Sequence, residues 1–226
     1  MNDESAALLT RGHGLERASA PRIFVTRGSG NSYKPFLVAH QLGLQCDWVF
    51  VDVLGGQTRT PEFLEVNPRG QVPFMVLSHG EGLAESNAIA WYLAEGSALV
   101  PAGPVERAQA LQWMFWEQTC LEPFVSPARF FTAIVPQQRS EHEAEFPGWL
   151  ARGSAGLAFL DEHLRRRDFL VGGAYSIADV AVYGYAHVAD EGGFRLAGYP
   201  CVAAWMERVQ AQAGHVPMSL LAPVAG

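Results

Sequence analysis

The segment VNPRGQVP, residues 66–73, comes directly before an apolar run at Phe74–Leu77 that is typical of a buried β-strand. Pro73 stands at the beginning of that run, where a proline cannot donate a hydrogen bond to a neighbouring strand. A cis Val72–Pro73 peptide bond would explain this proline, because it turns the chain sharply and leaves the Val72 N–H and C=O groups open to a peptide-like ligand. A trans proline that begins an edge strand is the alternative.

Short apolar runs and helical patterns alternate on both sides of this segment. Runs of β-branched and aromatic residues predict strands, and apolar residues at helical spacing predict helices. The strands are expected at Ile23–Val25, Trp48–Val53, Phe74–Leu77 and Leu83–Ala84, and the helices at Phe36–Leu42, Pro61–Leu64 and Ser86–Glu95. A helix between the first two strands makes them parallel, and a tight turn makes the last two a hairpin. The N-terminal part is therefore predicted to be a small α/β sheet with helices on both faces.

The composition changes at residues 99–104, which contain two prolines and a glycine. Beyond this stretch only helical patterns follow, beginning with a long helix expected from Val105 to about Phe131. Ser176–Asp179 has the serine and acid spacing of a helix capping box. These features predict an α/β domain followed by an all-α domain. The expected boundaries are a flexible N-terminal extension at 1–20, the α/β domain at 21–97, a linker at 98–103, the helical domain at 104–214 and a C-terminal tail at 215–226.

The composition excludes several classes of protein. Hydrophobic residues make up 49% of the 226 residues and the formal net charge is −7, so the chain fills a core and has no electrostatic attraction to nucleic acid. No apolar run reaches the roughly 20 residues of a membrane-spanning helix. Three distant cysteines, Cys46, Cys120 and Cys201, favour a reducing, cytoplasmic setting without disulfides, and the scattered histidines predict no metal site.

Ser29 and Asn31 lie at the beginning of the first expected helix, where free N–H groups and the helix dipole favour an anion. The turn contains no cysteine, so it would stabilise a thiolate that belongs to another molecule, with the Ser29 hydroxyl and the Asn31 amide as donors. Serine and asparagine are also ordinary helix caps, and both interpretations fit the local sequence.

Two other groups of residues are candidates for ligand binding. Glu85 and Ser86 precede a helix, where the acid would hold an ammonium group and the hydroxyl a carboxylate, the two charges of a free α-amino acid. Ser86 as a simple helix cap is the alternative. Trp113, Trp116 and Phe130 belong to an aromatic cluster on the long helix, which either fills the core or forms the wall of an apolar substrate pocket.

The order and spacing of four segments resemble the glutathione S-transferase family, in particular its cytosolic, bacterial nu-, beta- and theta-like members. The resemblance extends from about Arg22 to Gly214. The segments are RGSGNSYKPFLVAHQLG at 27–43, TPEFLEVNPRGQVPFMV at 60–76, LAESNAIAWYLAE at 83–95 and FLVGGAYSIADVAVYGY at 169–185. The third is close to a signature of the N-terminal domain of the family, and the fourth contains the capping box of its C-terminal domain.

This resemblance implies a thioredoxin-like domain followed by an all-α domain. Glutathione would bind as a co-substrate on the first domain, and a hydrophobic electrophile would bind between the two. It also implies a cytoplasmic homodimer that serves detoxification. Carried over by position, Ser29 and Asn31 would activate the thiol. Asn31 matches the asparagine that nu-like members use, and it stands where beta-like members have a cysteine. The implied glutathione-binding residues are Gln71, Val72 with the cis Pro73, Glu85 and Ser86.

The sequence leaves two classes of function open. The first is a glutathione S-transferase that activates the thiolate for attack on a hydrophobic electrophile or for reduction of a peroxide or disulfide. The second is a non-catalytic module of the same fold that carries ligands or contacts other proteins. A glutathione site without its anchoring groups would favour the module, and the presence of Gln71, Val72, Glu85, Ser86 and the Ser29 hydroxyl favours the enzyme.

Overall fold

A four-stranded sheet lies at the centre of the N-terminal half in the computed structural model, which describes residues 20–221. The strand order is β2-β1-β3-β4. Strand β1 pairs parallel with β2 and antiparallel with β3, and β3 and β4 form the antiparallel hairpin. The strands are β1 (Arg22–Val25), β2 (Asp47–Phe50), β3 (Phe74–Val76) and β4 (Gly82–Ala84). The predicted parallel pairing of the first two strands and the predicted hairpin of the last two are confirmed.

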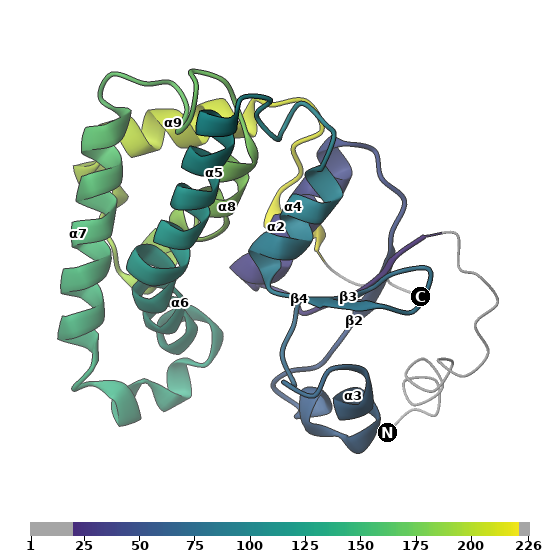
Figure 1. Cartoon of the computed structure of the whole chain (residues 1–226). Helices are drawn as coiled ribbons and strands as arrows, with labels where there is room; N and C mark the ends of the chain where they lie inside the picture. The colour runs from purple at the N-terminus through teal and green to yellow at the C-terminus, as the bar shows by residue number, and fades with distance from the viewer. Residues whose placement is uncertain (1–19, 222–226) are drawn as a thin grey trace.

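Helices cover the two faces of this sheet unequally (Figure 1). Alternate strand residues such as Ile23 and Met75 are fully buried beneath α2 (Gly30–Gln41) and α4 (Ser86–Ala94). The opposite face packs against the short helix α3 (Pro61–Val66), with Phe24 and Phe63 in an edge-to-face contact at 5.8 Å between ring centroids. The larger core therefore lies on the side of the sheet that faces the helical half.

The helical half begins with one continuous helical segment that is not a regular α-helix. It consists of α5 (Pro104–Trp116), a π-helical turn at Glu117–Leu121, α6 (Glu122–Arg129) and a second π-helical turn at Phe130–Ile134. The sequence predicts a single helix here and misses the two widened turns. Pro123 and Pro127 have no N–H group, so the regular ladder of i to i−4 hydrogen bonds is incomplete in this region.

Three more helices complete this half: α7 (Phe146–Leu164), α8 (Ile177–Ala186) and α9 (Pro200–Gln210). Helix α8 is buried along its whole length. Its first turn carries the predicted capping box, in which the Asp179 carboxylate accepts hydrogen bonds from the Ser176 N–H and hydroxyl at 2.9 and 3.1 Å. Burial raises the pKa of Asp179 to about 6. Short 3₁₀ turns lie at Gln57–Arg59, Pro136–His142, Ala189–Gly192, Leu196–Gly198 and Met218–Leu220.

The two halves meet where α2 crosses α8. A Cβ atom placed on Gly30 would lie 2.5 Å from the Gly184 carbonyl oxygen, so the backbones approach closely only because position 30 is a glycine. The proposed linker is packed as well, since the Leu99 carbonyl accepts a hydrogen bond from the Ile177 N–H at 2.8 Å. The first turn of α2, which carries the candidate thiol-activating residues, is thereby held against the helical half.

The end of the chain returns to the N-terminal half. The Tyr33 hydroxyl of α2 donates a hydrogen bond to the Val216 carbonyl and lies 3.3 Å from the His215 ring. Leu221 is buried. The tail expected at 215–226 is therefore packed against α2 as far as Leu221. The expected N-terminal extension, residues 1–20, lies outside the described residues except for Ala20.

Candidate functional site

A cleft of about 1290 Å³ runs between the two halves. The sheet side contributes the turn after β1, the loop before β3 and the start of α4, while the helical side contributes α6 and α8. The cleft brings together the predicted thiol-activating and glutathione-binding residues: Ser29, Asn31, Gln71, Val72, Pro73, Glu85 and Ser86.

Ser29 is the N-cap of α2. Its backbone is extended, and its side-chain oxygen accepts a hydrogen bond from the Ser32 N–H at 3.2 Å. This contact uses a lone pair of the hydroxyl and leaves its proton available as a donor. Gly28 precedes it with a φ of 66°, a value that suits glycine, and the Gly28 carbonyl accepts a hydrogen bond from Arg129 on α6. The Ser29 hydroxyl thus caps α2 and is also available to donate a hydrogen bond into the cleft.

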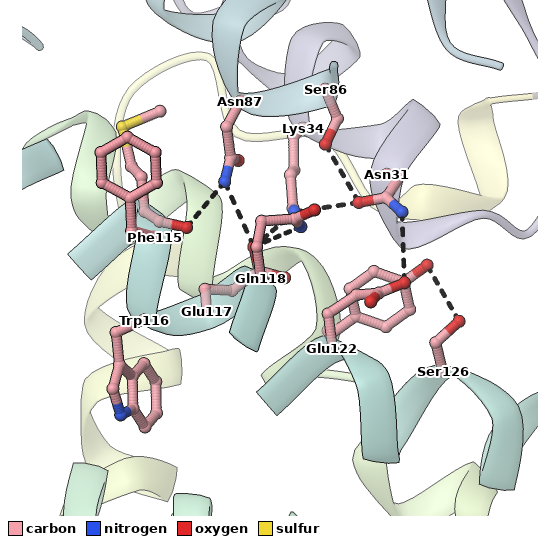
Figure 2. Close-up of polar contacts among 12 residues, drawn as sticks. Asn31, Lys34, Ser86, Asn87, Phe115, Trp116, Glu117, Gln118, Glu122 and Ser126 are labelled. Carbon is pink, nitrogen blue, oxygen red and sulfur yellow. Dashed lines mark hydrogen bonds and ion pairs between the residues drawn. The ribbon is translucent and has the colours of Figure 1, made fainter. Parts of the chain in front are cut away.

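Asn31 connects the start of α2 to α4 and α6 (Figure 2). Its carbonyl oxygen Oδ1 accepts hydrogen bonds from Lys34 Nζ and from the Ser86 hydroxyl, each at 3.0 Å. Its amide nitrogen Nδ2 donates to Glu122 Oε1 at 3.4 Å. The amide therefore presents its N–H side towards α6 and the cleft.

Glu85 and Ser86 lie at the beginning of α4. Glu85 is the one non-glycine residue between positions 20 and 221 with a positive φ, 71°, and its carboxylate pairs with Arg69 at 2.6 Å. The expectation that Ser86 caps the helix is wrong, because Ser86 is its first helical residue and its hydroxyl donates to Asn31 instead. The side chain of Ser86 is thus directed to the cleft and not to the helix backbone.

The loop before β3 forms the floor of the cleft. The Val72–Pro73 peptide bond is cis, as the sequence predicts. The buried Asn67 side chain donates a hydrogen bond to the Gln71 carbonyl at 2.7 Å, which fixes the chain just before this bond. Gln71, Val72 and Pro73 all line the cleft.

The three residues expected in an aromatic substrate pocket do not lie together. Phe130 lines the cleft, but Trp113 and Trp116 lie outside it. These two rings stack edge-to-face at 5.0 Å on the face of α5 that packs against Phe159 of α7. They precede the first π-helical turn, whereas the cleft-lining residues of this segment begin at Gln118, so most of α5 is turned away from the cleft.

Several cleft residues on the helical side are not predicted by the sequence reasoning. Glu122 and Arg129 are seven residues apart in an otherwise apolar helical segment. This spacing places both side chains on one face of the helix, and it is the sequence signal that could have identified them. Arg129 is almost fully buried and pairs with Glu191 at 2.8 Å. Ile134 and Tyr185 add apolar surface on the same side.

The electrostatics of the cleft centre on Glu122. Burial, and to a lesser extent the neighbouring Glu117, raise the pKa of the Glu122 carboxyl, while Lys34 and hydrogen bonds from Asn31 and Ser126 act in the opposite direction. Burial also raises the pKa of the Tyr185 hydroxyl. Burial therefore favours the neutral forms of the two titratable groups Glu122 and Tyr185 on the helical side of the cleft.

Neither metal-binding clusters nor membrane spans are found in the part of the chain that the structure describes. Across residues 20–221, no group of three His, Cys, Asp or Glu side chains is placed to hold a metal ion. In the same range, no helix combines the length and apolar character needed to cross a bilayer. The free cysteines Cys46, Cys120 and Cys201, all within this range, lie outside the cleft lining.

Comparison with known proteins identifies both halves. Residues 28–95 match the glutathione S-transferase N-terminal domain, and residues 137–208 match the glutathione S-transferase C-terminal domain. A solved structure described as a possible glutathione S-transferase from Rhodopseudomonas palustris is 44% identical, with a TM-score of 0.87 over 89% of this chain and 98% of that one.

Two other proteins extend the comparison. A disulfide-bond oxidoreductase of Escherichia coli is 32% identical over 194 residues, which cover 80% of this chain and 86% of the relative. A glutathione transferase from Pseudomonas putida, crystallised with one glutathione disulfide per subunit, shares the fold at 21% identity, with a TM-score of 0.78 over 97% of each chain.

The two domain matches follow one another in the order of the observed fold and together cover more than half of the chain. The thioredoxin-like sheet with its cis proline and the all-α half with its capping box agree with them. The chain belongs to the glutathione S-transferase family.

Proposed function

We propose that this chain is a glutathione transferase that binds glutathione along the sheet side of the cleft and ionises its thiol at the start of α2. One observation carries the proposal: the two donors Ser29 and Asn31 line the same cleft as a complete set of groups that suit the rest of the glutathione molecule. A carrier module would need the binding groups but not the two donors.

The proposed binding mode assigns one protein group to each part of glutathione. The Val72 backbone pairs with the cysteinyl residue at the sheet edge. The Ser86 hydroxyl and the N–H groups at the start of α4 hold the γ-glutamyl carboxylate, and Glu85 holds the ammonium. Gln71 holds the glycyl end. Since Arg69 contacts Glu85 Oε1, the second carboxylate oxygen of Glu85 remains available to the ammonium.

The proposed reaction begins when the thiol loses its proton beside Ser29 and Asn31. The thiolate sulfur then attacks an electrophilic carbon, a C–S bond forms, and the leaving group departs with the bonding electron pair. The electrophile would lie against Phe130, Ile134 and Tyr185, which are the large apolar and aromatic side chains on the helical side of the cleft. Conjugation to a hydrophobic electrophile is the reaction this arrangement supports best.

Reduction of a disulfide is the second candidate, and the similarity to the Escherichia coli oxidoreductase favours it. In that reaction the thiolate attacks one sulfur of a disulfide, a mixed disulfide with glutathione forms, and the other sulfur leaves as a thiolate. A second glutathione then completes the exchange and gives glutathione disulfide. The same donors serve both reactions, because each begins with the same thiolate.

We also propose a cytoplasmic homodimer. Three cysteines free of disulfides suit a reducing compartment. An exposed apolar surface that we call the outer aromatic face consists of Leu111 and Phe115, which lie one turn apart on α5, with Phe115 70% exposed. Large apolar side chains exposed close together are typical of protein interfaces, and the proposed dimer would cover this face with a second copy.

The proposal is tested by calorimetry with glutathione and by the thiolate absorbance of the bound molecule followed against pH. A thiol with an ordinary pKa of about 8.5 needs roughly 2.7 kcal/mol of preference for the thiolate to move down by two units. A hydrogen bond to a charged group contributes about 1.5–3 kcal/mol. We therefore expect Ser29→Ala and Asn31→Ala each to raise the pKa of the bound thiol by about one unit, and the double variant by about two.

Thr60→Ala is the matched control. Thr60 caps α3 through the Phe63 N–H at 3.3 Å, as Ser29 caps α2, but it does not line the cleft. It should lower stability by about 0.5–2 kcal/mol, as loss of a cap does, without changing the thiol pKa. Absence of glutathione binding would overturn the proposal. Binding without a thiolate, and without turnover of a chloronitrobenzene, a peroxide or a disulfide, would show a carrier module instead.

A further inference from the structure

A lysine and a glutamate form an ion pair that is wholly buried between the two halves of the molecule. Lys34 Nζ of α2 lies 2.7 Å from Glu117 Oε2 in the first π-helical turn, and neither side chain is exposed to solvent. A buried pair of charges contributes little net stability, because removal of both charges from water costs about as much as their attraction returns. The pair is therefore better explained by what it orients.

The pair is fixed from several directions. Glu117 Oε2 also accepts hydrogen bonds from Gln118 Nε2 at 2.8 Å and from Asn87 Nδ2 of α4 at 3.3 Å. Lys34 Nζ lies 5.6 Å from the centre of the Tyr185 ring of α8. These contacts, several of them drawn in Figure 2, leave the ammonium group little freedom to move. Its remaining strong contact is with Asn31 Oδ1 at 3.0 Å.

This last contact determines which way the Asn31 amide faces. An amide has a carbonyl side that accepts and an NH₂ side that donates, and only the carbonyl side is compatible with an ammonium group. With Oδ1 on Lys34, Nδ2 necessarily faces Glu122 and the cleft. The opposite orientation would place two sets of donors against each other and would present an acceptor to the cleft.

Ligand binding makes the lysine more important for this orientation. In the ligand-free arrangement Asn31 Oδ1 has two donors, Lys34 and the Ser86 hydroxyl. In the proposed glutathione complex the Ser86 hydroxyl turns to the γ-glutamyl carboxylate and leaves Asn31. Within residues 20–221, Lys34 is then the remaining side-chain donor to Asn31 Oδ1, and it holds the amide with its N–H side towards the thiol.

We propose that Lys34, held by Glu117, is a positioning residue for thiol activation, because it keeps the Asn31 amide turned so that Nδ2 donates to the glutathione thiolate. This inference rests on the proposed function and deepens it. The residue that positions the donor is on the first domain, and the carboxylate that holds it is on the second. Ionisation of the thiol thus depends on the contact between the domains.

The test is a double-mutant cycle on the pKa of the bound glutathione thiol. Lys34→Met should raise this pKa by about one unit in the wild-type background and leave it unchanged in the Asn31→Ala background, because Lys34 acts through Asn31. The double variant Lys34→Met/Glu117→Leu leaves no unpaired buried charge, so its thermal stability should return to near the wild-type value. Its thiol pKa should remain raised.

Each outcome decides between the proposals. A wild-type thiol pKa in the Lys34→Met/Glu117→Leu variant would overturn the inference, since the ion pair would then be structural alone. If Lys34→Met raises the thiol pKa equally in the wild-type and Asn31→Ala backgrounds, the inference is also overturned, because the lysine would then act directly on the thiolate. If Asn31→Ala changes nothing while Ser29→Ala abolishes the thiolate, the proposed function stands and this inference fails. If the wild-type protein binds no glutathione, the proposed function itself fails.

Discussion

Glu85 lines the cleft in a backbone conformation that lowers the stability of the folded chain. Its φ of 71° combined with a ψ of 118° belongs to a region that side chains with a Cβ rarely adopt, at a cost on the order of 1–3 kcal/mol. The same conformation begins α4 and brings the carboxylate next to Arg69 at the edge of the cleft. A glycine here would avoid the cost but would lack the carboxylate.

We therefore predict that Glu85→Gly is more stable than Glu85→Ala by about 1 kcal/mol, because glycine adopts this positive φ without the steric cost that alanine has. Both variants should weaken glutathione binding, because both remove the carboxylate that we propose to hold the ammonium. Urea unfolding measures the first effect and calorimetry the second. Equal stability of the two variants would contradict the strain, and unchanged affinity would contradict the assignment of Glu85 to the ligand.

The sequence identifies the cleft residues of the first domain better than those of the second. Ser29, Asn31 and Ser86 lie at starts of helices, where chemistry and position are coupled, so local patterns are informative. Glu122 reaches the cleft only because the tertiary fold brings the start of α6 near the start of α2, a relation that no local pattern contains. Trp116 is expected in the substrate pocket but contacts Phe159 of α7, for the same reason. The spacing of aromatic residues along a helix does not indicate which neighbouring element each face of that helix contacts.

At the scale of elements, the end of α8 carries a histidine in an apolar environment. The His187 ring stacks on Tyr183 at 4.5 Å, and its Nδ1 donates to the Tyr183 carbonyl. Within residues 20–221 its Nε2 has no hydrogen-bond partner. Burial lowers the pKa of His187 to about 4, and the positive charge of Arg129 and the neighbouring His215 act in the same direction. The folded protein therefore holds this histidine in its neutral form.

This environment predicts a loss of stability in acid. The unfolded chain binds a proton at His187 below about pH 6.5, but the folded chain does so only below about pH 4. The contribution of His187 is thus fully present above pH 6.5 and decreases as the pH falls to 4, by roughly 3 kcal/mol in total. The raised pKa of Asp179 has the opposite effect in nearly the same range, so the wild-type curve alone does not isolate the histidine.

His187→Phe isolates it, because Asp179 is common to both proteins. The difference in the free energy of unfolding between wild type and His187→Phe should be constant above pH 7. Between pH 6.5 and 4 it should move in favour of the phenylalanine variant by roughly 3 kcal/mol. Denaturant unfolding at several pH values measures this difference. A difference that does not depend on pH would mean that the histidine is already accessible to protons in the folded state.

Local sequence patterns predict most elements of this fold but not all of them. Each strand and each main helix is predictable, because hydrophobic period and turn residues act over a few neighbours. The two π-helical turns are not, since the apolar pattern from Val105 to Phe131 is equally compatible with a regular helix. The contact of Val216 with Tyr33 is also beyond local patterns, because it joins residues from opposite ends of the chain.

For the whole molecule, contacts between distant segments hold the cleft together. Arg129 joins α6 to Glu191 after α8 and to the Gly28 carbonyl before α2. Lys34 and Glu117 join the same two halves on the other side of Asn31. The cleft is thus closed at its base by groups from both domains, while the outer aromatic face on α5 remains exposed.

We predict that this exposed face is the surface of dimerisation. Sedimentation at micromolar concentration should give about twice the chain mass of 24.6 kDa. Leu111→Asp combined with Phe115→Asp should give the monomer, because two carboxylates cannot be buried unpaired in an interface. Leu220→Asp is the matched control, since Leu220 is 57% exposed but lies in the C-terminal segment. A monomeric wild type, or a dimer that survives both aspartates, would contradict this assignment.

A cleft without a sulfur of its own has a consequence for the working lifetime of each molecule. An enzyme that carries its reactive thiolate on a cysteine is itself alkylated or over-oxidised by the compounds it processes, and it then needs repair. Here the reactive sulfur enters with each glutathione and leaves with each product. Burial raises the pKa of the Cys46 thiol to about 11, so this cysteine is also slow to react. Under the proposed function, long exposure to electrophiles therefore consumes the replaceable co-substrate and spares the groups of the cleft.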